Sequence, residues 1–139
     1  MDREQCPECG GAYIDGLTCW DQLGAILSWE AQDPALAAVH FLTVACYNLQ
    51  HPAQFTDVAL AGLRTALVDH LQHGTPVTEL RRRAGRAYGG SRRVLKPPEE
   101  RRPILRRWSI PIAEVYAHGE PNAATDRVRA WAARLLSEC

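Results

Sequence analysis

The sequence has no apolar run long enough to cross a membrane. Its most apolar stretch, residues 35–47, includes His40 and Thr43 and is shorter than the roughly 20 residues that a membrane-spanning helix needs. The chain begins with several charged residues that lead directly to Cys6, without the apolar segment of a secretory signal peptide. We therefore expect a soluble, cytoplasmic protein that does not associate with membranes.

The common signatures of catalysis and nucleotide binding are also missing. The chain contains no phosphate-binding Gly-x-x-x-x-Gly-Lys loop, no Gly-x-Ser-x-Gly turn and no His-Glu-x-x-His helix. Sixteen basic residues balance sixteen acidic ones, so the net charge favours no particular partner. The composition is 46% hydrophobic and 23% charged, which is typical of a globular protein. These features predict a folded protein but no specific reaction.

Strand patterns and internal repeats are absent, whereas helical patterns are frequent. Apolar residues at helical spacing predict six helices, over residues 19–32, 34–50, 56–73, 76–86, 111–117 and 123–137. Thr18, Asp33, Thr56 and Asn122 are the expected N-caps, and Gly74 is expected to end the third helix. The predicted fold is therefore all-α, a small helical bundle of four to six helices.

The five cysteines are unevenly distributed. Three of them lie in the first nineteen residues, and the total is odd, which favours a metal site over a disulfide framework in a reducing compartment. Cys6 and Cys9 form a Cys-Pro-Glu-Cys-Gly knuckle, and Cys19 is a natural third ligand. Because zinc prefers four Cys or His ligands in a tetrahedron, a fourth ligand must come from elsewhere in the chain.

The expected helix packing suggests this fourth ligand. The helices at 19–32 and 34–50 are joined by a short turn and should pack antiparallel, which places Cys19 near Cys46, Tyr47 and His51. His40 lies about 16 Å from His51 along the helix axis, so the two cannot easily share an ion. We predict a structural zinc held by Cys6, Cys9, Cys19 and His51. Cys46 or His40 as the fourth ligand, a catalytic zinc with an open position, and metal-free cysteines remain alternatives.

The pattern resembles a known family. The residues that carry the likeness are Cys6-Pro7-x-Cys9-Gly10, Cys19, His40 and Tyr47-x-x-Gln50-His51-Pro52, together with the segment from Trp108 to Trp131. They resemble an uncharacterised bacterial family of unknown function, the one numbered 5946. The family pattern has an aspartate where this chain has Ala45, so any acid–base role of that carboxylate would be lost. The resemblance implies a fold and a site but no activity.

The second predicted helix carries several polar side chains that need partners if they are buried. One hypothesis is that they bond loop backbone and hold the knuckle in place. The alternative is a polar pocket beside the metal, which would support a metal-dependent enzyme around His40, Tyr47 and His51. The residues of this pocket would be His40, Tyr47, Gln50 and Glu30. We expect a hydrogen bond between Glu30 and His40.

Positive charge is concentrated in one part of the chain. Residues 81–107 contain eleven Arg and Lys against two Glu, a net charge of +9, and the remainder has a net charge of −9. Arginine suits phosphate and carboxylate, so this segment is expected to contact nucleic acid or an acidic protein partner, unless it pairs within the chain. The candidate contacts are Arg82, Arg83, Arg86, Arg92, Arg93, Arg106 and Arg107.

Together these patterns predict a single domain over residues 1–139. It would comprise a zinc-knuckle loop (1–18), a helical core (19–87), a basic extended segment (88–107) and C-terminal helices (108–139). The leading hypothesis is a zinc-stabilised interaction or accessory module, and the alternatives are a metal-dependent enzyme and a nucleic-acid-binding accessory protein. The sequence leaves the oligomeric state open.

Overall fold

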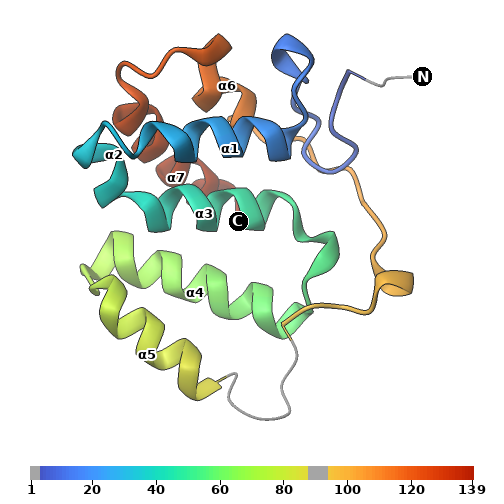
Figure 1. Ribbon diagram of the computed structural model, residues 1–139. Coiled ribbons are helices and arrows are strands. Elements are labelled where there is room, and N and C mark those ends of the chain that lie inside the picture. Colours follow the sequence, from blue (N-terminus) through green and yellow to red (C-terminus); the bar gives the residue numbers. More distant parts are fainter. Residues whose placement is uncertain (1–3, 88–93) are drawn as a thin grey trace.

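The computed structural model describes residues 4–87 and 94–139, and within these ranges the protein is all-α (Figure 1). The α-helices are α1 (Cys19–Trp29), α2 (Pro34–Ala38), α3 (His40–Gln50), α4 (Asp57–His73), α5 (Val77–Ala87), α6 (Ile112–Tyr116) and α7 (Ala124–Glu138). Four short 3-10 helices are η1 (Ile14–Gly16), η2 (Pro52–Gln54), η3 (Pro98–Glu100) and η4 (Ala117–Gly119). None of the described helices has the length and apolar character needed to cross a membrane.

Capping residues set several of the predicted helix ends. The Thr18 hydroxyl accepts a hydrogen bond from the Asp21 backbone N–H at 3.2 Å, and the Asp21 carboxylate accepts one from the Thr18 N–H at 3.3 Å. This capping box satisfies two backbone donors and fixes the first turn of α1. Asp33 caps α2, Thr56 caps α4, and Gly74 ends α4 with φ 70°, as predicted.

Two predicted helix boundaries are wrong. The helix expected over 34–50 breaks at Val39, which has φ −105° and ψ 20°, and becomes α2 and α3. The apolar pattern gave no sign of this break, because Val39 itself and its neighbours at helical spacing, Leu36 and Leu42, are all buried. Asn122 does not cap α7, whose N-cap position is Ala123, with φ 63° and no side-chain hydrogen bond.

The core is formed mainly by α1, α3, α6 and α7. Helix α1 packs on α6, and α3 lies between α4 and α7. Trp131, Ile26 and Leu42 from three of these helices are at most 1% exposed. Burying such side chains contributes about 1.5–3 kcal/mol each. The buried cysteines Cys6, Cys9 and Cys19 belong to the same cluster of side chains.

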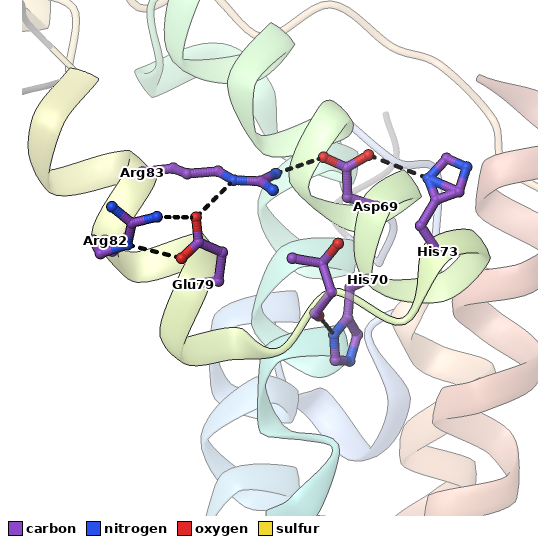
Figure 2. Close-up of polar contacts among 7 residues, drawn as sticks. Asp69, His70, His73, Glu79, Arg82 and Arg83 are labelled. Atoms are coloured by element: carbon purple, nitrogen blue, oxygen red, sulfur yellow. Dashed lines mark hydrogen bonds and ion pairs between the residues drawn. The ribbon is translucent and has the colours of Figure 1, made fainter.

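Helix α5 packs against α4, and charged side chains link the two (Figure 2). Arg83 binds Asp69 at 2.9 Å, and Glu79 binds Arg82 at 2.5 Å and Arg83 at 3.3 Å. Leu80 of α5 is buried. The helix therefore lies on the outer face of α4, away from α1 (Figure 1).

An extended segment follows the undescribed residues 88–93. It pairs with the start of α4 through the Thr56 N–H to Val94 carbonyl bond, at 2.9 Å. It then runs up to the N-terminal loop (Figure 1). We call its last part, residues 104–111, the strap. The strap exposes Ile104 to 79%, in agreement with the poor packing predicted for this region.

Candidate metal centre

The N-terminal loop folds as a tight knuckle around two cysteines. The Cys6 N–H donates to the Gly11 carbonyl at 2.9 Å, and the Gly10 N–H donates to the Cys6 carbonyl at 3.0 Å. Gly10 adopts φ 73°, a left-handed conformation that favours glycine. At Gly11, a Cβ atom would lie 2.9 Å from Pro111 Cβ and 3.2 Å from Cys9 Sγ. Both glycines are therefore needed for this turn and for the close approach of the strap.

Backbone amides of the knuckle point at the sulfur atoms. The Glu8 N–H donates to Cys6 Sγ at 3.4 Å, and the Gly11 N–H donates to Cys9 Sγ at 3.3 Å. Such bonds stabilise the thiolate form, which is the form that binds metal. Each of the two knuckle sulfur atoms therefore accepts one hydrogen bond from the backbone.

The helices supply the other two side chains. Cys19 is the first residue of α1, where the Thr18 capping box holds it, and His51 follows the last residue of α3. Helices α1 and α3 run antiparallel (Figure 1). Trp20 of α1 contacts Tyr47 of α3, with ring centroids 6.0 Å apart, so the end of α3 returns to the start of α1. This is the packing predicted from the short turn between them.

The four ligand atoms converge. One ligand atom each from Cys6, Cys9, Cys19 and His51 lie within 4.8 Å of one another, and all four residues are buried. Cys9 Sγ and Cys19 Sγ are 3.7 Å apart, far longer than the roughly 2.05 Å of a disulfide. A tetrahedron with metal–sulfur bonds of about 2.3 Å has edges of about 3.8 Å. The sulfur spacing therefore fits a tetrahedral metal ion.

His51 is oriented for coordination. Its Nδ1 lies 2.7 Å from the Tyr47 carbonyl oxygen, and because a carbonyl only accepts, Nδ1 carries the proton. The other ring nitrogen, Nε2, is buried and has no hydrogen-bond partner among the described residues. The ring also stacks on Tyr47, with centroids 4.2 Å apart. This is how a metal-binding histidine is usually held, with one nitrogen bonded to the protein and the other free for the metal.

The electrostatics of the cluster favour a cation. Hydrogen bonds from the Cys19 and Cys9 thiols lower the pKa of Cys6, and donation to Cys6 raises the pKa of Cys19. Burial lowers the pKa of His51, but the nearby sulfur atoms of Cys6 and Cys9 outweigh it and raise the pKa to about 10. Burial, reinforced by the nearby sulfur charges, raises the pKa of Tyr47. A divalent cation would supply the positive charge that these closely spaced sulfur atoms favour.

Glu8 and Gln22 support the centre and escaped the sequence analysis. The Glu8 carboxylate accepts the Ala53 N–H at 2.9 Å, and its backbone carbonyl accepts the Arg106 N–H at 2.8 Å. Gln22 is fully buried, and its Nε2 donates to the Ala12 and Leu17 carbonyls, both at 3.0 Å. The sequence could have predicted that Gln22 is buried, because it falls on the apolar face of α1 beside Leu23 and Ile26.

The reserve ligands lie elsewhere. Cys46 is fully buried but is not part of the cluster, and burial raises the pKa of its thiol. The His40 Nδ1 lies 2.9 Å from the Glu30 carboxylate, and the His40 side chain is 47% exposed. The predicted Glu30–His40 hydrogen bond is thus confirmed, at the opposite end of α3 from His51.

The structure does not gather the predicted polar pocket. Glu30 and His40 pair with each other at the start of α3, whereas Tyr47 packs against His51. Gln50 is buried and donates to the Ile110 carbonyl of the strap at 2.9 Å. Tyr47 therefore holds His51 of the candidate site and Gln50 holds the strap, which agrees with the hypothesis that these polar groups hold the loops in place.

The predicted anion contacts have different surroundings. Arg82 and Arg83 are paired with acidic residues of α4 and α5 (Figure 2). Arg106 lies over the Trp108 ring, with its guanidinium carbon 3.8 Å from the centroid, and Arg107 packs against Gly10 of the knuckle. Arg86 is exposed, and Arg92 and Arg93 lie outside the described residues. The five described members of this set are thus divided between α5 and the strap.

Fold and site together define an all-α protein with a buried cluster of three cysteines and one histidine that could bind a metal ion. The chain belongs to the family of unknown function DUF5946, whose model matches residues 4–139. The resemblance seen in the sequence is therefore confirmed over nearly the whole chain. Comparison with curated proteins and with solved structures finds no match.

Proposed function

We propose that this protein is a small interaction or accessory module whose fold is stabilised by one structural zinc ion. Cys6, Cys9, Cys19 and His51 would hold the ion. The observation that carries the proposal is the convergence of their four buried ligand atoms within 4.8 Å. Nε2 of His51, which has no hydrogen-bond partner in the described part of the chain, also supports it.

Zinc is the metal that this donor set favours. Three sulfurs and one imidazole nitrogen form a common structural zinc site, and hard cations such as magnesium and calcium prefer oxygen ligands. The site draws its ligands from the knuckle, from α1 and from the end of α3. An ion here would therefore join three separate segments of the chain.

The number of protein ligands favours a structural role over a catalytic one. Catalytic zinc sites usually have three protein ligands and leave the fourth position for water or substrate. Here four protein side chains converge and all are buried. The residues suggested for an enzymatic pocket do not gather beside the cluster, so no observation favours the catalytic alternative.

Elemental analysis of the purified protein tests the proposal. We expect about one zinc per chain, and replacement by cobalt should give the visible absorption of a tetrahedral thiolate site. The Cys9→Ser variant should lose the metal and the absorption. Cys139→Ser is the matched control, because Cys139 is exposed and outside the cluster. Metal-free wild-type protein, or equal metal content in the Cys9→Ser variant, would refute the proposal.

A further inference from the structure

A groove with two arginines runs along one side of α4. It consists of two cavities of about 240 and 280 Å³, which share Arg64 and Cys139 as lining residues. The α4 residues that line them extend from Asp57 to Gln72, a distance of about 22 Å along the helix. The opposite wall is formed by the end of α3, the strap and the end of α7. The shared residues join the two cavities end to end.

The groove combines apolar surface with positive charge. Leu49, Leu60, Val68 and Leu136 contribute apolar side chains, and Trp108 lies in the wall beside Arg106. Arg64 is exposed and has no acidic partner within 4 Å among the described residues. Among the described residues that line the groove, Asp57 at one end is the one with an acidic side chain.

The Arg106 side chain is held by two contacts, neither of which is to an acidic side chain. Its guanidinium lies over the Trp108 ring and donates to the Glu138 backbone carbonyl. The Glu138 carboxylate is engaged elsewhere, by Ser109 and by Arg134 at 3.2 Å. Partial burial raises the pKa of the Cys139 thiol, and the charges of Arg106 and Arg64 oppose this rise. Both guanidinium groups therefore lie near the same part of the groove.

We infer that this groove binds a peptide segment of a partner protein in which apolar residues are interspersed with Asp or Glu. The apolar side chains of the peptide would lie on the leucine and valine surface. Its carboxylates would pair with Arg64 and Arg106, since arginine binds carboxylate through two parallel hydrogen bonds.

The dimensions favour a peptide over a small molecule. Each cavity is smaller than the roughly 300–1,000 Å³ of typical small-molecule pockets. The whole groove, however, has the length of about fifteen helical residues or about six to seven extended ones. Helical peptides in apolar grooves are a recurrent mode of recognition. The positive charge selects an acidic peptide rather than a basic or neutral one.

The test uses a phage-displayed library of random peptides of about 16 residues, selected against the full-length protein. We expect enriched sequences that combine Leu, Ile or Phe with Asp and Glu. In fluorescence anisotropy, Arg64→Gln should weaken the binding of a selected peptide at least about tenfold, and Arg64→Lys should weaken it less. Arg129→Gln is the matched control, because Arg129 is an exposed arginine of α7 outside the groove.

Several outcomes would overturn the inference. They are no enrichment, enrichment of peptides without acidic residues, and binding that Arg64→Gln leaves unchanged. Loss of oligonucleotide binding in the Arg64→Gln variant, without acidic-peptide binding by the wild type, would assign the groove to nucleic acid. Dimers that Arg64→Gln dissociates would assign it to a second copy of the chain. Each of these two results would also refute an acidic peptide partner.

The inference is linked to the proposed function at one point. The backbone N–H of Arg106, a groove residue, donates to the carbonyl of Glu8 in the knuckle at 2.8 Å, so the position of Arg106 depends on the knuckle. The metal content of every sample is therefore measured together with peptide binding. A metal-free protein that binds acidic peptides through Arg64 would refute the zinc proposal alone. A zinc-loaded protein that binds none would refute the groove alone. Equal melting temperatures of Arg64→Gln and wild type exclude misfolding as the cause of lost binding.

Discussion

Glu8 joins the knuckle to two other segments through different atoms. Its carboxylate accepts the Ala53 N–H of η2, and its backbone carbonyl accepts the Arg106 N–H of the strap. Only the first of these bonds depends on the side chain. Substitution of Glu8 can therefore separate the support given by η2 from the support given by the strap.

We predict that Glu8→Ala lowers the affinity for zinc about 10- to 100-fold, the usual effect of removing a group that orients metal ligands. Glu8→Gln keeps an acceptor oxygen for the Ala53 N–H, so its affinity should stay close to that of the wild type. Competition with a chromophoric chelator measures both values. Equal zinc affinity of Glu8→Ala and the wild type would show that the bond to η2 does not position the cluster.

At the residue scale, the sequence was informative where chemistry depends on spacing. The Cys6 and Cys9 spacing identified the knuckle, and the helix geometry brought Cys19 and His51 to it, as the structure shows. Glu8 was missed because its partner, Ala53, is 45 residues away. A contact between a side chain and a distant backbone amide leaves no periodic signal in a sequence.

At the element scale, Thr18 connects helix formation to the metal centre. Its hydroxyl and the Asp21 side chain close the capping box that begins α1, and Cys19 is the next residue. A side-chain cap both satisfies backbone donors and fixes the direction in which the chain enters a helix. The position of the Cys19 sulfur therefore depends on this cap.

Thr18→Ala should lower the free energy of unfolding by about 1 kcal/mol, the usual value of an N-cap. In a chain of this size that corresponds to about 4 °C in melting temperature. Thr18→Ser retains the hydroxyl and should remain near the wild-type value. Thermal unfolding followed by circular dichroism checks both variants. If Thr18→Ala and Thr18→Ser melt at the same temperature, the hydroxyl does not stabilise α1.

Most helices were predicted from local sequence signals, because caps and glycine stops act locally. Thr56 and Gly74 defined α4. The predictions failed at Val39 and Ala123, because local sequence signals do not determine the backbone conformation at these residues. At the start of α7, Arg127 binds the Val115 carbonyl at 2.9 Å and the Asn122 carbonyl at 2.6 Å. These bonds fix the loop that precedes α7, but because a guanidinium only donates, they leave the first turn of α7 without the side-chain cap that Asn122 was expected to provide.

At the scale of the whole molecule, the metal cluster and the apolar core are continuous. Cys6, Cys9 and Cys19 belong to the same buried cluster as Leu42 and Trp131. The strap crosses the knuckle, and Gln50 at the end of α3 binds the strap through the Ile110 carbonyl. Loss of the ion would therefore loosen α1, α3 and the strap together, not the N-terminal loop alone.

We predict that removing zinc with EDTA lowers the melting temperature by about 15 °C while unfolding remains a single transition. Binding of an ion at about 1,000 times its dissociation constant stabilises the folded state by about 4 kcal/mol, and each kcal/mol shifts the transition by about 4 °C. Differential scanning calorimetry with and without the chelator measures the shift, and added zinc should reverse it. Cys9→Ser should melt at the lower temperature whether or not EDTA is present.

Hydrogen exchange provides the decisive comparison, because amides of α1 and α3 should exchange faster together with those of the knuckle when the ion is removed. Faster exchange confined to residues 4–18 would instead show that the ion stabilises only the loop.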